Sequence, residues 1–246
     1  MPTTLRKAAV VIAVSTSLTA LTAVTGPAGA SPARRPAAVT APASPEAAPV
    51  LRADYKFRGN RRSVSPAAPT LFDVGSGGRS GFAADVVDGA ERIVLEFPQA
   101  NGLQLVDATN VIPRNRYTIA VKFRFADVTG YRRVIDFSRA VSDNGPYVLN
   151  GAFVFHPNAL DSPVNIDADE WVNVVLTRSR AGRLRGYVDG TQVFDFTDPS
   201  AGKITDLNTL RFFRDNDNRE ESGGGVSRIR LYDNGMTPAQ VAALGT

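Results

Sequence analysis

Hydrophobic and polar residues alternate along much of the chain, which is the pattern of a β-strand that buries one face. The clearest run is YTIAVKFRFAD, in which Tyr117, Ile119, Val121, Phe123 and Phe125 share one face. Polar or small side chains occupy the other face. Because β-branched and aromatic residues fill every second position, this run predicts a strand.

Further runs of the same kind follow one another with Gly, Pro, Asn and Asp between them. These runs are RIVLEF (92–97), RVIDF (133–137), GAFVFH (151–156), WVNVVLTR (171–178), RLRGYV (183–188), TQVFDF (191–196), LRFFR (210–214) and VSRIRLY (226–232). The Asp189-Gly190 pair between two runs tolerates the positive φ angles of a type I′ turn and predicts a β-hairpin. Many short strands with regular turns predict an all-β sandwich or barrel.

The end of the chain, TPAQVAALG, has the pattern of a short helix. Thr237 suits the N-cap, Pro238 suits the first turn, and Gln240 completes a capping box. A helix this short is not stable alone. We therefore expect Val241 and Leu244 to pack against the sheets.

The N-terminal part of the chain has the pattern of an export signal followed by a linker, and we do not expect it to belong to the folded domain. Residues 1–30 have two basic residues, Arg6 and Lys7, near their start. An apolar run diluted by Ser and Thr follows and ends in Ala-Gly-Ala, as in a secretory signal peptide. The run falls short of the roughly 20 apolar residues that span a bilayer, so we expect no membrane insertion after cleavage. An Ala/Pro-rich linker (31–50) then precedes one domain (51–246).

Composition narrows the classes of function. The chain has no cysteine, which removes disulfides, lipid anchoring through cysteine and thiol nucleophiles. The net charge of +4 falls to +2 once Arg6 and Lys7 leave with the signal peptide. Since the arginines are scattered along the chain, the concentrated basic footprint of a nucleic-acid-binding protein is missing.

Three stretches resemble one family of secreted modules. They are YTIAVKFRF (117–125), EWVNVVLTRSRAGRLRGYVDGTQV (170–193) and GGVSRIRLYDNGMTPAQVAALG (224–245). In order and spacing they are similar to the laminin-G-like, concanavalin A-like jelly-roll domains. The resemblance implies a two-sheet antiparallel β-sandwich with one short C-terminal helix. Members of this family bind sugars or proteins, form parts of adhesins, or, in distant branches, cleave polysaccharides, so the fold alone does not give the function.

The sequence contains only weak matches to the residue patterns of catalytic sites. The Glu-x-Asp-x-x-Glu strand of the glucan-cleaving branch does not occur, and Glu91 and Glu96 are spaced for opposite faces of a strand. Asp167 and Asp169 have same-face spacing but lie in an expected turn. The only histidine, His156, precedes a proline at a strand end, where a structural or exposed role is expected.

An acidic, glycine-rich loop, RDNDNREESGGG, is the strongest candidate for a metal site. We expect Asp215 and Asp217, with Glu221 third, to hold Ca²⁺ with the help of main-chain oxygens, because calcium prefers oxygen ligands. The loop does not follow the EF-hand pattern. A metal-free loop stays open as the alternative, because Asp and Asn are common in turns. Another Gly-rich stretch, LFDVGSGGRSG (71–81), is expected to be a flexible connection between the first strands.

From these observations we expect a secreted, extracellular, non-catalytic recognition module. We expect it to bind carbohydrate or an extracellular protein, with calcium as a structural ligand. Tyr55, Tyr131 and Tyr147 are the candidate contact aromatics. The alternatives are a glycoside hydrolase or polysaccharide lyase on the same fold, and a purely structural or adhesive surface protein.

Overall fold

A computed structural model of the chain describes residues 47–216 and 219–245. The predicted signal peptide, most of the predicted linker and Asp217 lie outside these residues. Within them the regular secondary structure is almost entirely antiparallel β-strand, as the alternating pattern predicts. Of the helices in this part of the chain, none is long and apolar enough to cross a membrane.

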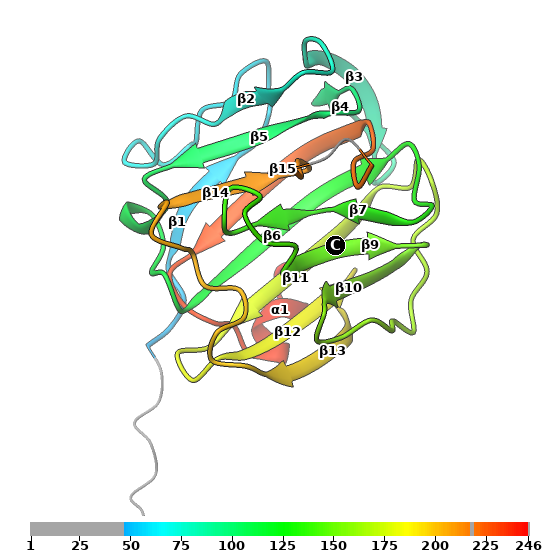
Figure 1. The fold of residues 1–246 in the computed structure, drawn as a ribbon. Helices are drawn as coiled ribbons and strands as arrows, with labels where there is room; N and C mark the ends of the chain where they lie inside the picture. The colour runs from blue at the N-terminus through cyan, green and yellow to red at the C-terminus, as the bar shows by residue number, and fades with distance from the viewer. Residues whose placement is uncertain (1–46, 217–218, 246) are drawn as a thin grey trace, which may run out of the picture. The chain divides into compact units, whose positions relative to one another are not determined.

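The larger sheet has eight strands in the order β13-β12-β11-β6-β15-β4-β3, and β1 also pairs with β15. Its strands are β1 (Leu51–Tyr55), β3 (Gly81–Val87), β4 (Ala90–Phe97), β6 (Tyr117–Phe125), β11 (Val172–Arg178), β12 (Arg183–Val188), β13 (Thr191–Thr197) and β15 (Gly224–Tyr232). Figure 1 shows this sheet as the rear layer, behind the strands of the second layer.

The second layer consists of two short sheets, β2-β5-β14-β8 and β10-β9-β7. Its strands are β2 (Phe72–Gly75), β5 (Asn101–Val106), β7 (Tyr131–Arg133), β8 (Ile135–Asp136), β9 (Gly145–Leu149), β10 (Ala152–His156) and β14 (Thr209–Phe212). Val134 joins β7 to β8, and it donates to the carbonyl of Pro146 and accepts from the amide of Phe213. These two bonds make the short sheets one continuous layer.

The hydrophobic core lies between the two layers. The β6 face that the sequence predicts to be buried, from Tyr117 to Phe125, is at most 1% exposed. Phe153 and Phe155 of the second layer belong to the same cluster. The predicted two-sheet sandwich is therefore confirmed. The 71–81 stretch, expected to be a flexible connection, instead contains the whole of β2, whose Phe72 pairs with Gln104 of β5.

Helix α1 (Pro238–Ala242) follows a capping box, as predicted: Thr237 accepts from the amide of Gln240, and Gln240 accepts from that of Thr237. Val241 and Leu244 pack on the outer face of the eight-stranded sheet, in a cluster separate from the main core. The only other described helix is the short 3₁₀ turn η1 (Ala108–Asn110).

The chain enters the sandwich beside its own C-terminal segment. The carbonyl of Ala47 accepts from the Asn234 side chain at 2.6 Å, and the amide of Val50 donates to Asp233 at 2.8 Å. The last residues assigned to the linker therefore already contact the domain.

Candidate functional site

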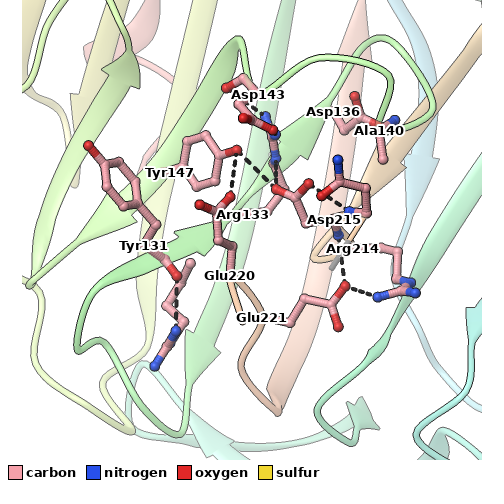
Figure 2. A network of polar contacts seen from close by, with 12 residues as sticks. Tyr131, Arg133, Asp136, Ala140, Asp143, Tyr147, Arg214, Asp215, Glu220 and Glu221 are labelled. Carbon is pink, nitrogen blue, oxygen red and sulfur yellow. Dashed lines mark hydrogen bonds and ion pairs between the residues drawn. The ribbon is translucent and has the colours of Figure 1, made fainter. Parts of the chain in front are cut away.

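Arg133 is the centre of a buried polar network on the outer side of the second layer (Figure 2). Its Nε donates to Oδ2 of Asp215 at 2.6 Å, and the side chains of both partners are 0% exposed. The guanidinium carbon lies 4.0 Å from the centre of the Tyr147 ring. A buried charge pair needs further hydrogen bonds to offset its lost hydration. The carbonyls of residues 142–144 supply them, each at 3.4 Å from a guanidinium nitrogen.

The Tyr147 hydroxyl joins two carboxyl groups. Its oxygen lies 2.9 Å from Oδ2 of Asp215 and 3.1 Å from Oε2 of Glu220. A hydroxyl has one proton to donate. Burial raises the pKa of Asp215, but the hydrogen bond and the charge of Arg133 outweigh burial and lower it. Tyr147 therefore donates to the ionised Asp215.

The pKa of Glu220 is shifted in the opposite direction from that of Asp215. Burial, followed by the negative charge of Asp215, raises the pKa of Glu220. When protonated, Glu220 donates to the Tyr147 oxygen and completes a chain from Glu220 through Tyr147 and Asp215 to Arg133. In that state the network holds one positive and one negative charge.

Two loops carry the network, and a buried carboxylate fixes each of them. Asp136 accepts from the amides of Ser138 and Ala140 at 2.8 and 2.6 Å, which shapes the loop before β9. Glu221 accepts from the amide of Asp215 at 2.9 Å and from the Arg214 side chain, which shapes the loop after β14.

Three aromatic rings surround the network. Tyr131, Tyr147 and His156 meet edge to face, with ring centres 5.3 to 6.3 Å apart. Tyr131 and His156 are half-buried, and Nδ1 of His156 has no hydrogen-bond partner within the described part of the chain. The rim therefore offers aromatic ring faces beside the Glu220 carboxyl group, whereas Nδ1 of His156 is buried.

Two of the three predicted calcium ligands, Asp215 and Glu221, bind different partners. Asp215 is occupied by Arg133, Tyr147 and the amide of Asn216. Glu221 faces Arg214, and its Oε2 is buried without a hydrogen-bond partner in the described residues. Asp217 lies outside the described residues, so the predicted set of three stays a prediction.

A different acidic group does gather. Oxygens of Asp143, Asp215 and Glu220 lie within 4.8 Å of one another. The sequence loop supplies two of these residues, and Asp143 comes from the distant loop before β9. Because Arg133 already lies 2.6 Å from Asp215 and 3.9 Å from Asp143, its guanidinium occupies the place that a cation would take.

Two of the carboxylates considered for catalysis, Glu96 and Asp169, have a common partner. Glu96 and Asp169 meet at Arg124, at 2.8 and 3.0 Å, together with Asp85 at 3.0 Å. The Trp171 indole donates to Asp85 at 3.2 Å. This cluster is an ion-pair network around one guanidinium, on the outer face of the eight-stranded sheet.

Sequence reasoning missed Arg133, Asp143 and Glu220 as parts of the site. Arg133 lies 82 positions from Asp215, and nothing in the local pattern joins the two. The one available signal was an arginine in a strand otherwise rich in apolar residues, YRRVIDF, because a strand arginine on a buried layer requires an acidic partner.

The fold that carries this site is similar to those of known proteins. The family model of the concanavalin A-like lectin/glucanases superfamily matches residues 97–242. No curated protein sequence matches the chain. Domain 4 of AbnA, a GH43 extracellular arabinanase from Geobacillus stearothermophilus, has a similar structure, solved in complex with arabinotriose. The TM-score is 0.65 and the identity 16%, over 80% of this chain and 99% of that one.

Two toxin binding domains are also similar in structure. That of Paraclostridial Mosquitocidal Protein 1 has a TM-score of 0.56 at 12% identity, and that of Botulinum neurotoxin DC, in complex with rat synaptotagmin II, has 0.54 at 10%. Each match covers 79% of this chain but only about half of the toxin domain, 51% and 50%. At sequence identities this low, the structural similarity shows a shared fold and nothing more. The matched family model, which spans more than half of the chain, shows that the protein belongs to the concanavalin A-like lectin/glucanases superfamily.

Proposed function

We propose that this protein is a secreted, non-catalytic recognition module that binds carbohydrate on the face formed by Tyr131, His156 and Glu220. The observation that carries the proposal is the juxtaposition of half-buried aromatic rings with polar groups that the buried Arg133 network holds in place. The arabinotriose complex of the AbnA domain supports a sugar ligand on this fold.

The chemistry of the face suits a neutral sugar. A sugar ring presents apolar C–H faces, which pack on aromatic rings, and hydroxyl groups, which need donors and acceptors at fixed positions. Tyr131 supplies a ring and a hydroxyl, His156 a ring, and Glu220 a carboxyl group. Fixing these groups before binding reduces the entropy lost on association.

The same geometry favours holding a ligand over cleaving it. Glycoside hydrolysis requires two carboxyl groups on either side of a bond in an open groove. Of the three carboxyl groups gathered here, Asp215 is 1% exposed and ion-paired. We expect the purified protein to release no product from polysaccharides. Turnover that is lost in Glu220→Gln would overturn the non-catalytic part of the proposal.

Glycan binding can be measured directly with the purified chain on an array of neutral and acidic oligosaccharides. We expect Tyr131→Ala to lose binding to neutral glycans. Phe72→Ala is the matched control, because Phe72 is an aromatic residue on the same layer that is 52% exposed. Equal binding by both variants would remove this face from the proposal. Binding to an extracellular protein, with no glycan bound, would replace carbohydrate with a protein partner.

Secretion belongs to the same proposal. It is supported by the signal-peptide pattern of residues 1–30. Expression of the full chain in a bacterial host, followed by N-terminal sequencing of the exported protein, should give a chain that begins at Ser31. Retention of an intact N-terminus inside the cell would contradict export.

Calcium also remains a proposal, as a structural ligand of the loop after β14. The Glu221 Oε2 atom supports it, because a buried carboxylate oxygen without a partner is costly. Of the predicted set, Asp217 and Glu221 would bind the ion, because Arg133 already holds Asp215. The ion would supply the partner that Oε2 of Glu221 lacks.

A further inference from the structure

A cleft opens on the outer face of the eight-stranded sheet because one edge of β15 is divided between two strands. Gly224–Val226 pairs with β4, and Ile229–Tyr232 pairs with β1. At Ser227 and Arg228, between these segments, neither strand pairs with β15, and β15 also shifts its register against β6. The diverging strands leave a cleft of about 880 Å³.

The cleft has two walls and a floor. Lys56, Arg58 and Gly59, which follow β1, form one wall, and the β3–β4 hairpin forms the other. The hairpin contributes Phe82, Arg92 and Ile93, and the floor includes Lys122 of β6 and Arg228 and Arg230 of β15. The floor residues of β6 and β15 alternate with core residues, so the cleft faces away from the hydrophobic core.

Basic residues dominate this lining, with six Lys or Arg side chains against two carboxylates. Three of the six have acidic partners. Arg228 contacts Asp54 at 2.8 Å, Lys56 contacts the same Asp54 at 3.6 Å, and Lys122 contacts Asp88 at 2.6 Å.

The other three, Arg58, Arg92 and Arg230, form no ion pair with any carboxylate in the described part of the chain. Arg58 and Arg92 are exposed on opposite walls, and Arg230 is half-buried on the floor. The Arg230 guanidinium reaches the Leu244 carbonyl only at 3.4 Å, and burial lowers its pKa. Asp54, the cross-strand neighbour of Arg230, already forms ion pairs with Arg228 and Lys56. The Arg230 guanidinium therefore favours a further anionic group within hydrogen-bond distance.

We propose that this cleft is a second ligand site that binds the carboxylate groups of an acidic polysaccharide. The planar guanidinium group matches a carboxylate with two parallel hydrogen bonds. Phe82 and Ile93, which are 37% and 43% exposed, offer apolar surface for sugar rings beside those charges. The choice of a glycan over other polyanions rests on the proposed carbohydrate-binding function.

The test uses three polymers and the chain that begins at Ser31. Polygalacturonate carries a carboxylate on every sugar, its fully methyl-esterified form has the same backbone without charge, and polyglutamate has the charge without the sugar. We expect calorimetric titration to show binding to polygalacturonate alone, weakening as salt screens the charges. Equal binding to the ester would exclude carboxylate recognition. Equal binding to polyglutamate would exclude a glycan-specific site.

Variants locate the binding in the cleft. Arg58→Gln with Arg92→Gln should weaken polygalacturonate binding by roughly tenfold or more, because each substitution removes a charged hydrogen-bonding partner. The control is Arg139→Gln with Arg180→Gln, which removes two exposed arginines outside the cleft. Unchanged affinity in the cleft variant, or an equal loss in the control, would overturn the proposal.

Failure at the cleft is separable from failure of the proposed function. The Arg58 and Arg92 substitutions should leave the binding of neutral glycans at Tyr131 unchanged, and Tyr131→Ala should leave polygalacturonate binding unchanged. Loss of both activities in either single experiment would contradict two separate sites, provided that circular dichroism shows the variant to be folded.

Discussion

At the scale of single residues, burial of Arg133 beside Asp215 makes each of them dependent on the other. Neither side chain is exposed, so Arg133→Met leaves the Asp215 charge uncompensated. Breaking a buried pair on one side costs about 3–5 kcal/mol. We expect this loss in the free energy of unfolding measured by urea titration. Arg183→Met, at an exposed pair with Asp195, is the control and should change little.

Glu220 should make the stability depend on pH. Its pKa is raised in the folded state, so folding favours its protonated form, and this stabilisation is lost as pH rises from about 4 through the folded pKa. Glu220→Gln stays neutral and does not lose it. The free energy of unfolding of the variant, relative to the natural protein, should therefore rise with pH. A constant difference between acidic and neutral pH would contradict a raised pKa.

At the scale of elements, the β12–β13 hairpin depends on its turn. Asp189 and Gly190 have φ angles of 44° and 81°, as the predicted type I′ turn requires. A side chain at Gly190 would meet no atom within 4 Å, so Gly190→Ala isolates the backbone cost of about 1–2 kcal/mol. Gly81→Ala, with equal space and no positive φ, should cost less in thermal unfolding. Equal losses would mean that the turn is not strained.

The loop after β14 should respond to calcium. A ligand that binds only the folded state raises the melting temperature. We expect millimolar Ca²⁺ to raise it, and Glu221→Gln with Asp217→Asn to abolish the rise. Mg²⁺ is the control, because it prefers a smaller octahedral site that keeps its own waters. An unchanged melting curve with Ca²⁺ would leave the metal-free loop.

At the scale of the whole molecule, the first and last strands complete each other. Ala53 and Tyr55 of β1 are fully buried, and Asp54 pairs with Arg228 of β15. A chain that begins at Ala47 should unfold at the same temperature as one that begins at Ser31. A chain that begins at Lys56 lacks β1 and should lose cooperative unfolding, measured by calorimetry. Cooperative unfolding of the shortest chain would show that β1 is dispensable.

Much of this fold was predictable because its signals are local. Alternation identified the buried face of β6, Asp-Gly identified the hairpin, and the capping box identified α1. Strands that carry glycine or proline, such as β2 and β9, were not predicted, because pairing with a neighbour outweighs their weak intrinsic preference.

The candidate site was predictable only in part. The sequence by itself determined a β-sandwich with an acidic loop that contains Asp215 and Glu221. Tertiary structure decided that Arg133 neutralises Asp215 and that β15 is divided between β1 and β4, which opens the cleft. Both depend on contacts between distant segments. Alternation specifies which side of a strand is buried, whereas the packing of the whole chain decides which strands and charges become neighbours.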